Sequence, residues 1–126
     1  MLENRRATAM IPASNVKRAL AWYEEKLGLT PSEIYADGMS AVFELAGVRA
    51  FLYPTEFAGT AQHTILSFDS DDLVEDMRTM RQRGVVFIDY DLPGLKTENG
   101  LAQFGPVKNA WCTDSEGNIL GFVEGM

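Results

Sequence analysis

The sequence repeats one pattern of elements twice, and this repeat restricts the fold more than any other feature. In each half a short apolar run leads to a capping residue, a helical stretch that ends at glycine, and a hairpin. The capping residues Asn15 and Ser70 stand 55 residues apart, and aligning Gly47 with Gly117 superposes the hairpins. Spacing of this kind predicts two copies of one supersecondary unit.

The first half is predicted to contain one strand, one helix and three further strands. Apolar residues at helical spacing and the stop at Gly28 predict a helix over 14–27, with Ser14 or Asn15 as its cap. The dipeptides Asp37-Gly38 and Ala46-Gly47 are hairpin signals. They separate predicted strands over 32–36, 40–45 and 48–53, which follow a first strand over 7–12.

The second half repeats this order. A strand over 63–68 leads to a helix that begins among the acids 69–72 and ends at Gly84, and strands are predicted over 85–90, 109–113 and 118–124. The segment 91–107 is rich in glycine and proline and longer than a structural connection needs. It is either a loop that covers a pocket or a variable insertion.

The last hairpin carries a motif with a known resemblance. Its turn reads Asp114-Ser115-Glu116-Gly117-Asn118, with Gly117 at the position that needs positive φ. This turn resembles the aspartate-x-x-glycine-asparagine signature of the vicinal oxygen chelate superfamily, which contains glyoxalase I, extradiol dioxygenases and bleomycin-resistance proteins, although Ser115 replaces the usual proline. The resemblance implies an α+β fold in which two βαβββ modules, 6–55 and 62–126, form curved mixed sheets around a concave cleft within a single domain, 1–126.

Strand alternation predicts which residues face the helices and which face the cleft. One parity is apolar throughout and is assigned to the core: Ala9, Ile11, Val42, Ala50, Leu52, Leu66, Phe68, Cys112, Leu120 and Phe122. The other parity mixes aromatic rings with a few polar groups, which is typical of a small-molecule pocket. Its candidate ligand-binding residues are Thr8, Met10, Phe43, Arg49, Phe51, Tyr53, His63, Ser67, Asn109, Trp111 and Gly121. The alternative is that part of this face is a second core or a subunit interface.

Large rings are expected beside small residues on that face, with Trp111 opposite Gly121 and Phe51 opposite Ala41. Such rings would occupy the centre of the cleft and leave an aromatic-lined hollow that stacks on a planar or cationic ligand.

The resemblance also implies four positions for metal ligands, which fall on Thr8, Phe51, His63 and Gly121. Phe51 and Gly121 carry no donor atom, and one imidazole cannot replace several carboxylate or imidazole ligands. We therefore expect no metal and no other cofactor. His63, the only histidine, is a candidate catalytic or hydrogen-bonding group, or simply a polar residue at the start of a strand.

Composition excludes several classes of partner. The net charge of −7, from 18 acids and 11 bases, disfavours nucleic acid. No apolar run is long enough to span a membrane, and the N-terminus lacks the apolar stretch of a secretory signal, so a cytoplasmic location is expected. Cys112 is expected to be a buried apolar residue rather than a reactive thiol.

Two functions remain from the sequence. The first is a metal-free binding protein, similar to bleomycin-resistance proteins, that sequesters an aromatic or cationic compound as a homodimer. The alternative is a metal-dependent lyase, isomerase or dioxygenase of the same superfamily that uses His63. A structural or partner-binding module is a third possibility, because a fold does not fix a function.

Overall fold

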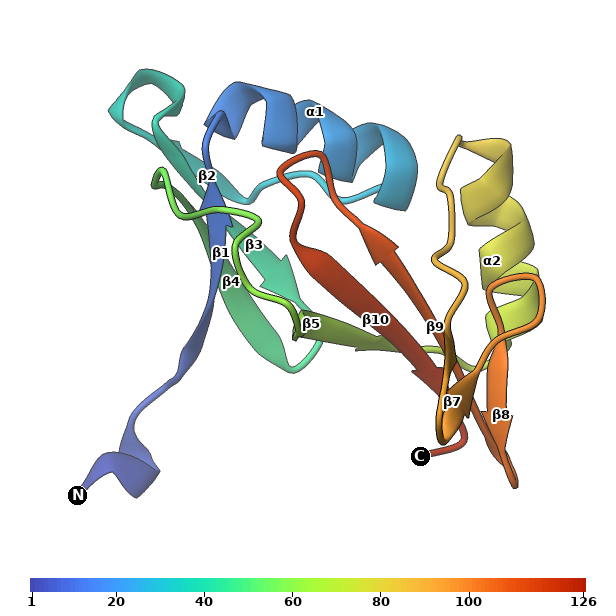
Figure 1. Ribbon diagram of the computed structural model, residues 1–126. Coiled ribbons are helices and arrows are strands. Elements are labelled where there is room, and N and C mark those ends of the chain that lie inside the picture. The colour runs from blue at the N-terminus through green and yellow to red at the C-terminus, as the bar shows by residue number, and fades with distance from the viewer.

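Each half of the chain forms one four-stranded mixed sheet with one helix (Figure 1). The computed structural model describes all 126 residues. The first half contains β1 (Thr8–Ala13), α1 (Val16–Leu27), β2 (Glu33–Tyr35), β3 (Ser40–Leu45) and β4 (Val48–Pro54), in the sheet order β1-β4-β3-β2. Short 3-10 turns cover Leu2–Asn4 and Ala36–Gly38. The β1–β4 pair is parallel and the others are antiparallel.

The second sheet has the order β5-β10-β9-β8. Its elements are β5 (Thr64–Asp69), α2 (Leu73–Gln82), β8 (Ala102–Phe104), β9 (Val107–Thr113) and β10 (Ile119–Glu124). A small separate hairpin joins β6 (Asp91–Leu92) to β7 (Leu95–Lys96). The α+β fold that the resemblance implies and the predicted repeat are both confirmed, because β5 pairs in parallel with β10 as β1 does with β4.

The helix ends follow from local chemistry. The Asn15 side chain accepts a hydrogen bond of 3.0 Å from the Arg18 N–H at the start of α1, and Gly28 ends that helix with φ of 70°. The cap of α2 is Asp72, which accepts from the Glu75 N–H, and not Ser70 as the repeat alignment suggested. The Ser70 hydroxyl instead accepts from the Asp72 N–H and donates to Asp76.

The predicted strand over 85–90 is wrong. The backbone of this segment pairs with β9 only at an isolated bridge between Phe87 and Cys112 and at the bond from the Ile88 N–H to the Trp111 carbonyl. The fourth strand of the sheet is β8, from within the segment predicted to be a loop. The turn at Gly105-Pro106 sets β8 antiparallel to β9 by pairing Phe104 with Val107.

The predicted facing of β3 is also wrong. The two-residue turn Ala46-Gly47 pairs Leu45 with Val48, which places Val42, and not Ala41, opposite Phe51. Since cross-strand partners share a face, Val42 lies on the open face and Ala41 and Phe43 face the helix. Phe43, predicted to bind ligand, is only 1% exposed, and its ring lies 5.7 Å from that of Tyr23.

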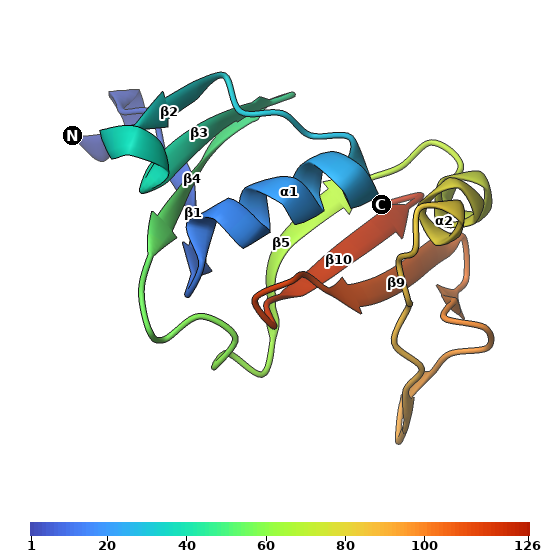
Figure 2. The same cartoon turned by 90° about the horizontal axis from the view of Figure 1, so that it is seen from above.

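A single core joins the two halves. It contains 17 buried residues drawn from both sheets and both helices. Figure 2 shows why: α1 lies between the first sheet and the β9–β10 hairpin, while α2 lies beside the second sheet. Cys112 is fully buried in this core, as predicted, and burial followed by the charge of Asp114 raises the pKa of its thiol to about 12. Neither helix has the length and apolar character needed to cross a membrane.

Candidate functional site

The three polar side chains of the signature turn between β9 and β10, those of Asp114, Glu116 and Asn118, are buried and hydrogen-bonded. The Asp114 carboxylate accepts from the backbone N–H groups of Glu116 and Asn118, from the Asn118 side chain, and from the Tyr23 hydroxyl at 2.6 Å. Burial, followed by the charge of Asp114, raises the pKa of the Tyr23 hydroxyl, so this phenol stays a donor. The turn is thereby fixed to α1.

Glu116 makes a second attachment to the first half of the chain. Its carboxylate accepts from the Arg18 guanidinium at 2.8 and 3.0 Å, from the Asn15 N–H, and from the hydroxyls of Ser14 and Ser115. Burial alone raises the pKa of Glu116, but these donors outweigh it and lower the pKa to about 2. The side chain of Glu116 is fully inaccessible, so no ligand reaches this carboxylate.

Asn118 makes the third attachment. Its side-chain amide donates to the Pro12 carbonyl at 2.8 Å and accepts from the Gly59 N–H at 3.1 Å. The backbone of Gly59 lies so close that a Cβ there would approach the Glu116 carbonyl to 2.4 Å. The motif that carries the family resemblance is therefore a lock between the two modules, and no buried polar side-chain atom of the protein lacks a partner.

The open face of the first sheet, away from α1, holds the candidate binding site. A cleft of about 470 Å³ lies there, within the range of small-molecule sites. Its lining contains four of the predicted ligand-binding residues and three that were not predicted: Thr8, Met10, Arg49 and Phe51, with Tyr35, Ser40 and Val42. We call this the open-face cleft.

Arg49 supplies the only charge in the open-face cleft. Its Nε and Nη2 atoms donate to the Thr8 hydroxyl at 3.1 and 2.9 Å, which fixes the guanidinium beside the apolar wall. Arg49 forms no salt bridge, so its remaining N–H groups are free for a ligand.

Aromatic rings form the wall of the cleft. Phe51 and Tyr53 stack with ring centres 6.5 Å apart and planes 6° apart, and Tyr35 meets Phe51 edge-on at the same distance. Tyr53 thus adjoins the cleft without lining it. The Tyr35 hydroxyl donates to Glu33 at 2.8 Å, and this bond raises the pKa of Tyr35.

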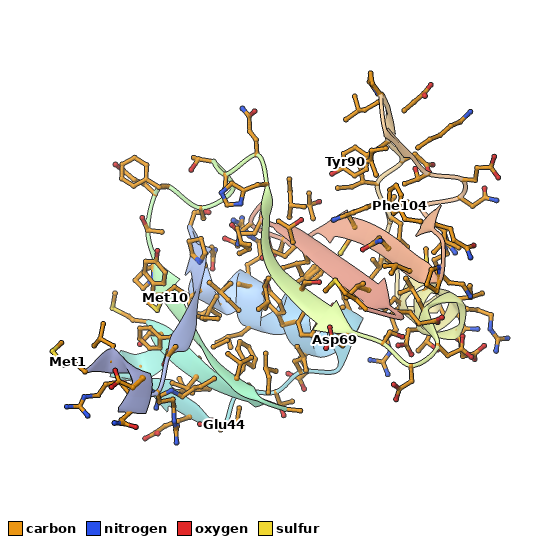
Figure 3. All side chains as sticks on the ribbon, turned by 90° about the horizontal axis from the view of Figure 1, so that it is seen from below. Met1, Met10, Glu44, Asp69, Tyr90 and Phe104 are labelled. Atoms are coloured by element: carbon orange, nitrogen blue, oxygen red, sulfur yellow. The ribbon has the colours of Figure 1, made fainter.

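The remaining predicted residues of the strands lie on the second sheet. Gly121 pairs with Trp111, as predicted, and on its other side with Ser67. Asn109 pairs with Val123. The Trp111 ring meets that of Tyr90 edge-on at 5.4 Å. Figure 3, viewed from below, places Met10 on the first sheet well apart from Tyr90. None of these second-sheet residues lines the open-face cleft.

His63 lies outside the strand and outside the cleft. The side chain is exposed, and its Nδ1 atom lies 3.0 Å from the Thr64 carbonyl. An extra residue, Ile65, sits in β5 where Thr64 pairs with Ile119 and Leu66 with Leu120. This bulge breaks the alternation that predicted His63 and Ser67 on one face.

The four positions that the resemblance gives for metal ligands do not suit a metal. Phe51 and Gly121 lack donors, Thr8 is engaged by Arg49, and His63 stands alone. No three His, Cys, Asp or Glu side chains come together in an arrangement that could hold an ion. The donor set does not fit the metal that the fold family implies.

Ser40 and Val42 were not predicted because the expected pairing of β3 with β4 was wrong by one residue, and Tyr35 lies in a strand for which alternation gave no predicted face. The signal was present, since a two-residue turn at Ala46-Gly47 fixes the pairing of the strands that flank it. Counting outward from that turn places Val42 opposite Phe51.

Paired βαβββ modules with a cleft on the open face of a sheet define a class of protein, and the comparisons agree with it. The sequence matches the Glyoxalase/Bleomycin resistance protein/Dioxygenase superfamily over residues 5–122, and the chain belongs to this superfamily. No functionally curated protein matches the sequence.

Several solved structures share the fold. A glyoxalase/bleomycin resistance protein from Catenulispora acidiphila has a TM-score of 0.72 at 22% identity, covering 96% of this chain and 98% of its own. Lactoylglutathione lyase from Agrobacterium tumefaciens has a TM-score of 0.71 at 14% identity, with 97% and 94% covered. The fosfomycin resistance protein FosX from Listeria monocytogenes has a TM-score of 0.70 at 10% identity, with 95% and 92% covered. At these identities the likeness establishes the fold alone.

Proposed function

We propose that this protein binds a small planar aromatic compound in the open-face cleft and holds it without converting it. The observation that carries the proposal is Arg49, a half-buried cation with spare donors beside stacked rings. The apolar wall would bury the flat face of the ligand, and the guanidinium would bind an acceptor group at its edge.

Arg49 also selects the charge of the ligand. The sequence favoured an aromatic or cationic compound, but a cation in this cleft would lie beside Arg49 with no acid among the lining residues. A carboxylate or another anionic acceptor suits the site better, because the guanidinium presents its N–H groups as a planar fork. The net charge of −7 is a property of the whole surface and does not alter this local preference.

The side chains that line the cleft are suited to binding a ligand but not to catalysing a reaction on it. The lining offers the hydroxyls of Thr8, Ser40 and Tyr35 and no carboxylate, imidazole or thiol to act as an acid or base. The alternative, a metal-dependent lyase, isomerase or dioxygenase that uses His63, needs additional donors near an imidazole that is here exposed and isolated. Sequestration of a toxic aromatic compound, such as an antibiotic, is the role that this kind of binding would serve.

We further propose that the protein is a homodimer in which a second copy covers the first sheet. Strands β1 and β2 are the two edges of the first sheet, and large apolar side chains are exposed on these strands or next to them: Met10 at 50%, Ile34 at 54% and Met39 at 59%. Apolar groups gathered at a sheet edge favour association. Sedimentation at micromolar concentration should give a dimer that Ile34→Lys converts to monomer, and a wild-type monomer would contradict this part of the proposal.

The metal-free binding function is tested by calorimetry and metal analysis on the same sample. 2-Naphthoate should bind saturably, and its affinity should be unchanged after chelator treatment, whereas 2-naphthylmethylamine, of similar shape and opposite charge, should bind far more weakly. Stoichiometric zinc, iron, manganese or nickel in the purified protein, or loss of naphthoate binding with chelator, would contradict the proposal.

A further inference from the structure

A second cavity lies on the helix side of the second sheet. Its volume is about 310 Å³, and it lies where the C-terminal ends of α1 and α2 approach β5 and β10. The apolar lining comes from both helix ends and both strands: Leu27, Leu29, Phe68, Met80 and Phe122. The rings of Phe68 and Phe122 stack 5.7 Å apart, with planes 16° apart. This helix-end cavity shares no residue with the open-face cleft.

Two cations line the same cavity. Lys26 comes from the last turn of α1 and Arg83 follows the last turn of α2. Each reaches across to the other helix: a Cβ on Gly84 would lie 2.8 Å from Lys26 Nζ, and a Cβ on Gly28 would lie 2.9 Å from Arg83 Nη1. Both positive charges are therefore held at the junction of the two helix ends.

Neither cation has a partner in the protein. Lys26 and Arg83 form no salt bridge, and neither side chain donates a hydrogen bond. Lys26 and Arg83 are not fully explained as caps of the helix C-termini, because backbone N–H groups already donate to carbonyls in the last turns of both helices. The N–H groups of Gly28 and Leu29 bond the carbonyls of Glu24 and Tyr23, and Val85 bonds that of Met80. The donors of both cations are left for a ligand.

The charge of the lining is positive on balance. Asp76 is the only acid in it, set against Lys26 and Arg83, and its carboxylate already accepts from the Ser70 hydroxyl. The protein as a whole has a net charge of −7, but this cavity places two unpaired cations next to the stacked rings of Phe68 and Phe122. The local charge is therefore opposite in sign to that of the whole protein.

We propose that the helix-end cavity binds an organic anion with an apolar tail, of the class of medium-chain carboxylates. The carboxylate would bridge Lys26 and Arg83, and the tail would lie on the Phe68–Phe122 pair. Such a ligand would join the ends of α1 and α2 by a contact that the chain alone does not make.

The test is an NMR titration of the full chain with octanoate, using 1-octanol as the uncharged probe. Octanoate should give saturable shifts at Leu27, Met80, Phe122 and the helix ends, with a much smaller response to octanol.

The double variant Lys26→Met/Arg83→Met should weaken octanoate binding about tenfold or more. Thr79→Trp, an exposed α2 position in the lining, should block the cavity while retaining both charges.

Two controls keep this site separate from the open-face cleft. Lys17→Met removes a lysine from the other end of α1, and Arg49→Met removes the cation of the open-face cleft; both should leave octanoate binding unchanged. Thermal unfolding of each variant checks that it folds. Shifts that map to the open-face cleft, equal responses to octanoate and octanol, or unchanged binding in both the double variant and Thr79→Trp would overturn the proposal.

Discussion

The signature turn and the open-face cleft both concentrate polar groups, but they use them in opposite ways. In the turn, Asp114, Glu116 and Asn118 are at most 8% exposed, and every buried polar side-chain atom has a partner within the chain. In the cleft, Arg49 is half-buried, donates to one hydroxyl, and retains free donors next to aromatic rings that are not fully buried.

This difference indicates that the turn stabilises the fold and that the cleft is the place where a ligand can bind. A buried polar network that is complete can only hold the fold, because binding a ligand would first require breaking it. A fixed group with unsatisfied donors beside apolar surface is what a ligand needs. The best recognised motif of the sequence is therefore a structural device here, and the binding site lies elsewhere. The following predictions test that division, in order of decreasing effect.

Asp114→Ala should give the largest loss of stability. It removes the acceptor of four hydrogen bonds, one of them from the buried Tyr23 hydroxyl, and leaves those donors without partners. We expect a loss of about 3–5 kcal/mol in the free energy of unfolding by urea. The control Glu25→Ala, on the exposed face of α1, should change it by less than about 0.5 kcal/mol. A similar change in the free energy of unfolding for the two variants would show that the turn does not stabilise the contact between the two modules.

Glu116 should make stability depend on pH in the acidic range. Its pKa is about 2 in the folded protein against 4.5 as a reference, so its stabilisation is complete above about pH 4.5 and is lost as the pH falls towards 2. The shift corresponds to about 3 kcal/mol. Urea unfolding at a series of pH values should therefore give a steeper acid loss for the wild type than for Glu116→Gln, and parallel curves would contradict this assignment.

Arg49→Met should weaken ligand binding and leave the fold intact. Losing the charged donor should lower 2-naphthoate affinity about tenfold, while the free energy of unfolding changes by less than about 0.5 kcal/mol. Calorimetry and urea unfolding of the same preparation measure both effects. Arg18→Met is the matched comparison, because Arg18 serves the turn: it should lose stability and keep naphthoate affinity. A reversal of these two outcomes would contradict the division between the regions.

His63→Ala should have the smallest effect. The imidazole is exposed and makes only a local contact with the Thr64 carbonyl. We expect stability within about 0.5 kcal/mol of wild type and unchanged 2-naphthoate affinity. A marked loss of binding, or of any activity found for the protein, would instead support the enzymatic alternative.

Much of the fold could be predicted because local chemistry decides it. Apolar spacing and the stop at Gly28 located α1, and the turn residues of Asp114–Asn118 located the last hairpin. Within that hairpin, the pairing of Trp111 with Gly121 followed from the turn. These features depend on residues close together in the sequence.

The site was predicted less well because it depends on strand register. Phe43 was assigned to the cleft through an error of one residue in pairing β3 with β4, and such an error exchanges the two faces of a strand. The bulge at Ile65 has no signal in the sequence, and it removed His63 from the face to which alternation assigned it. The segment 85–90 has strand composition, yet β8 takes its place as the fourth strand beside β9.

Amide chemical-shift mapping during a 2-naphthoate titration tests the central claim most directly. The account predicts saturable shifts centred on Thr8, Met10, Val42, Arg49 and Phe51, with the turn residues 114–118 unmoved. Shifts centred on the turn, on His63 or on the open face of the second sheet would contradict it.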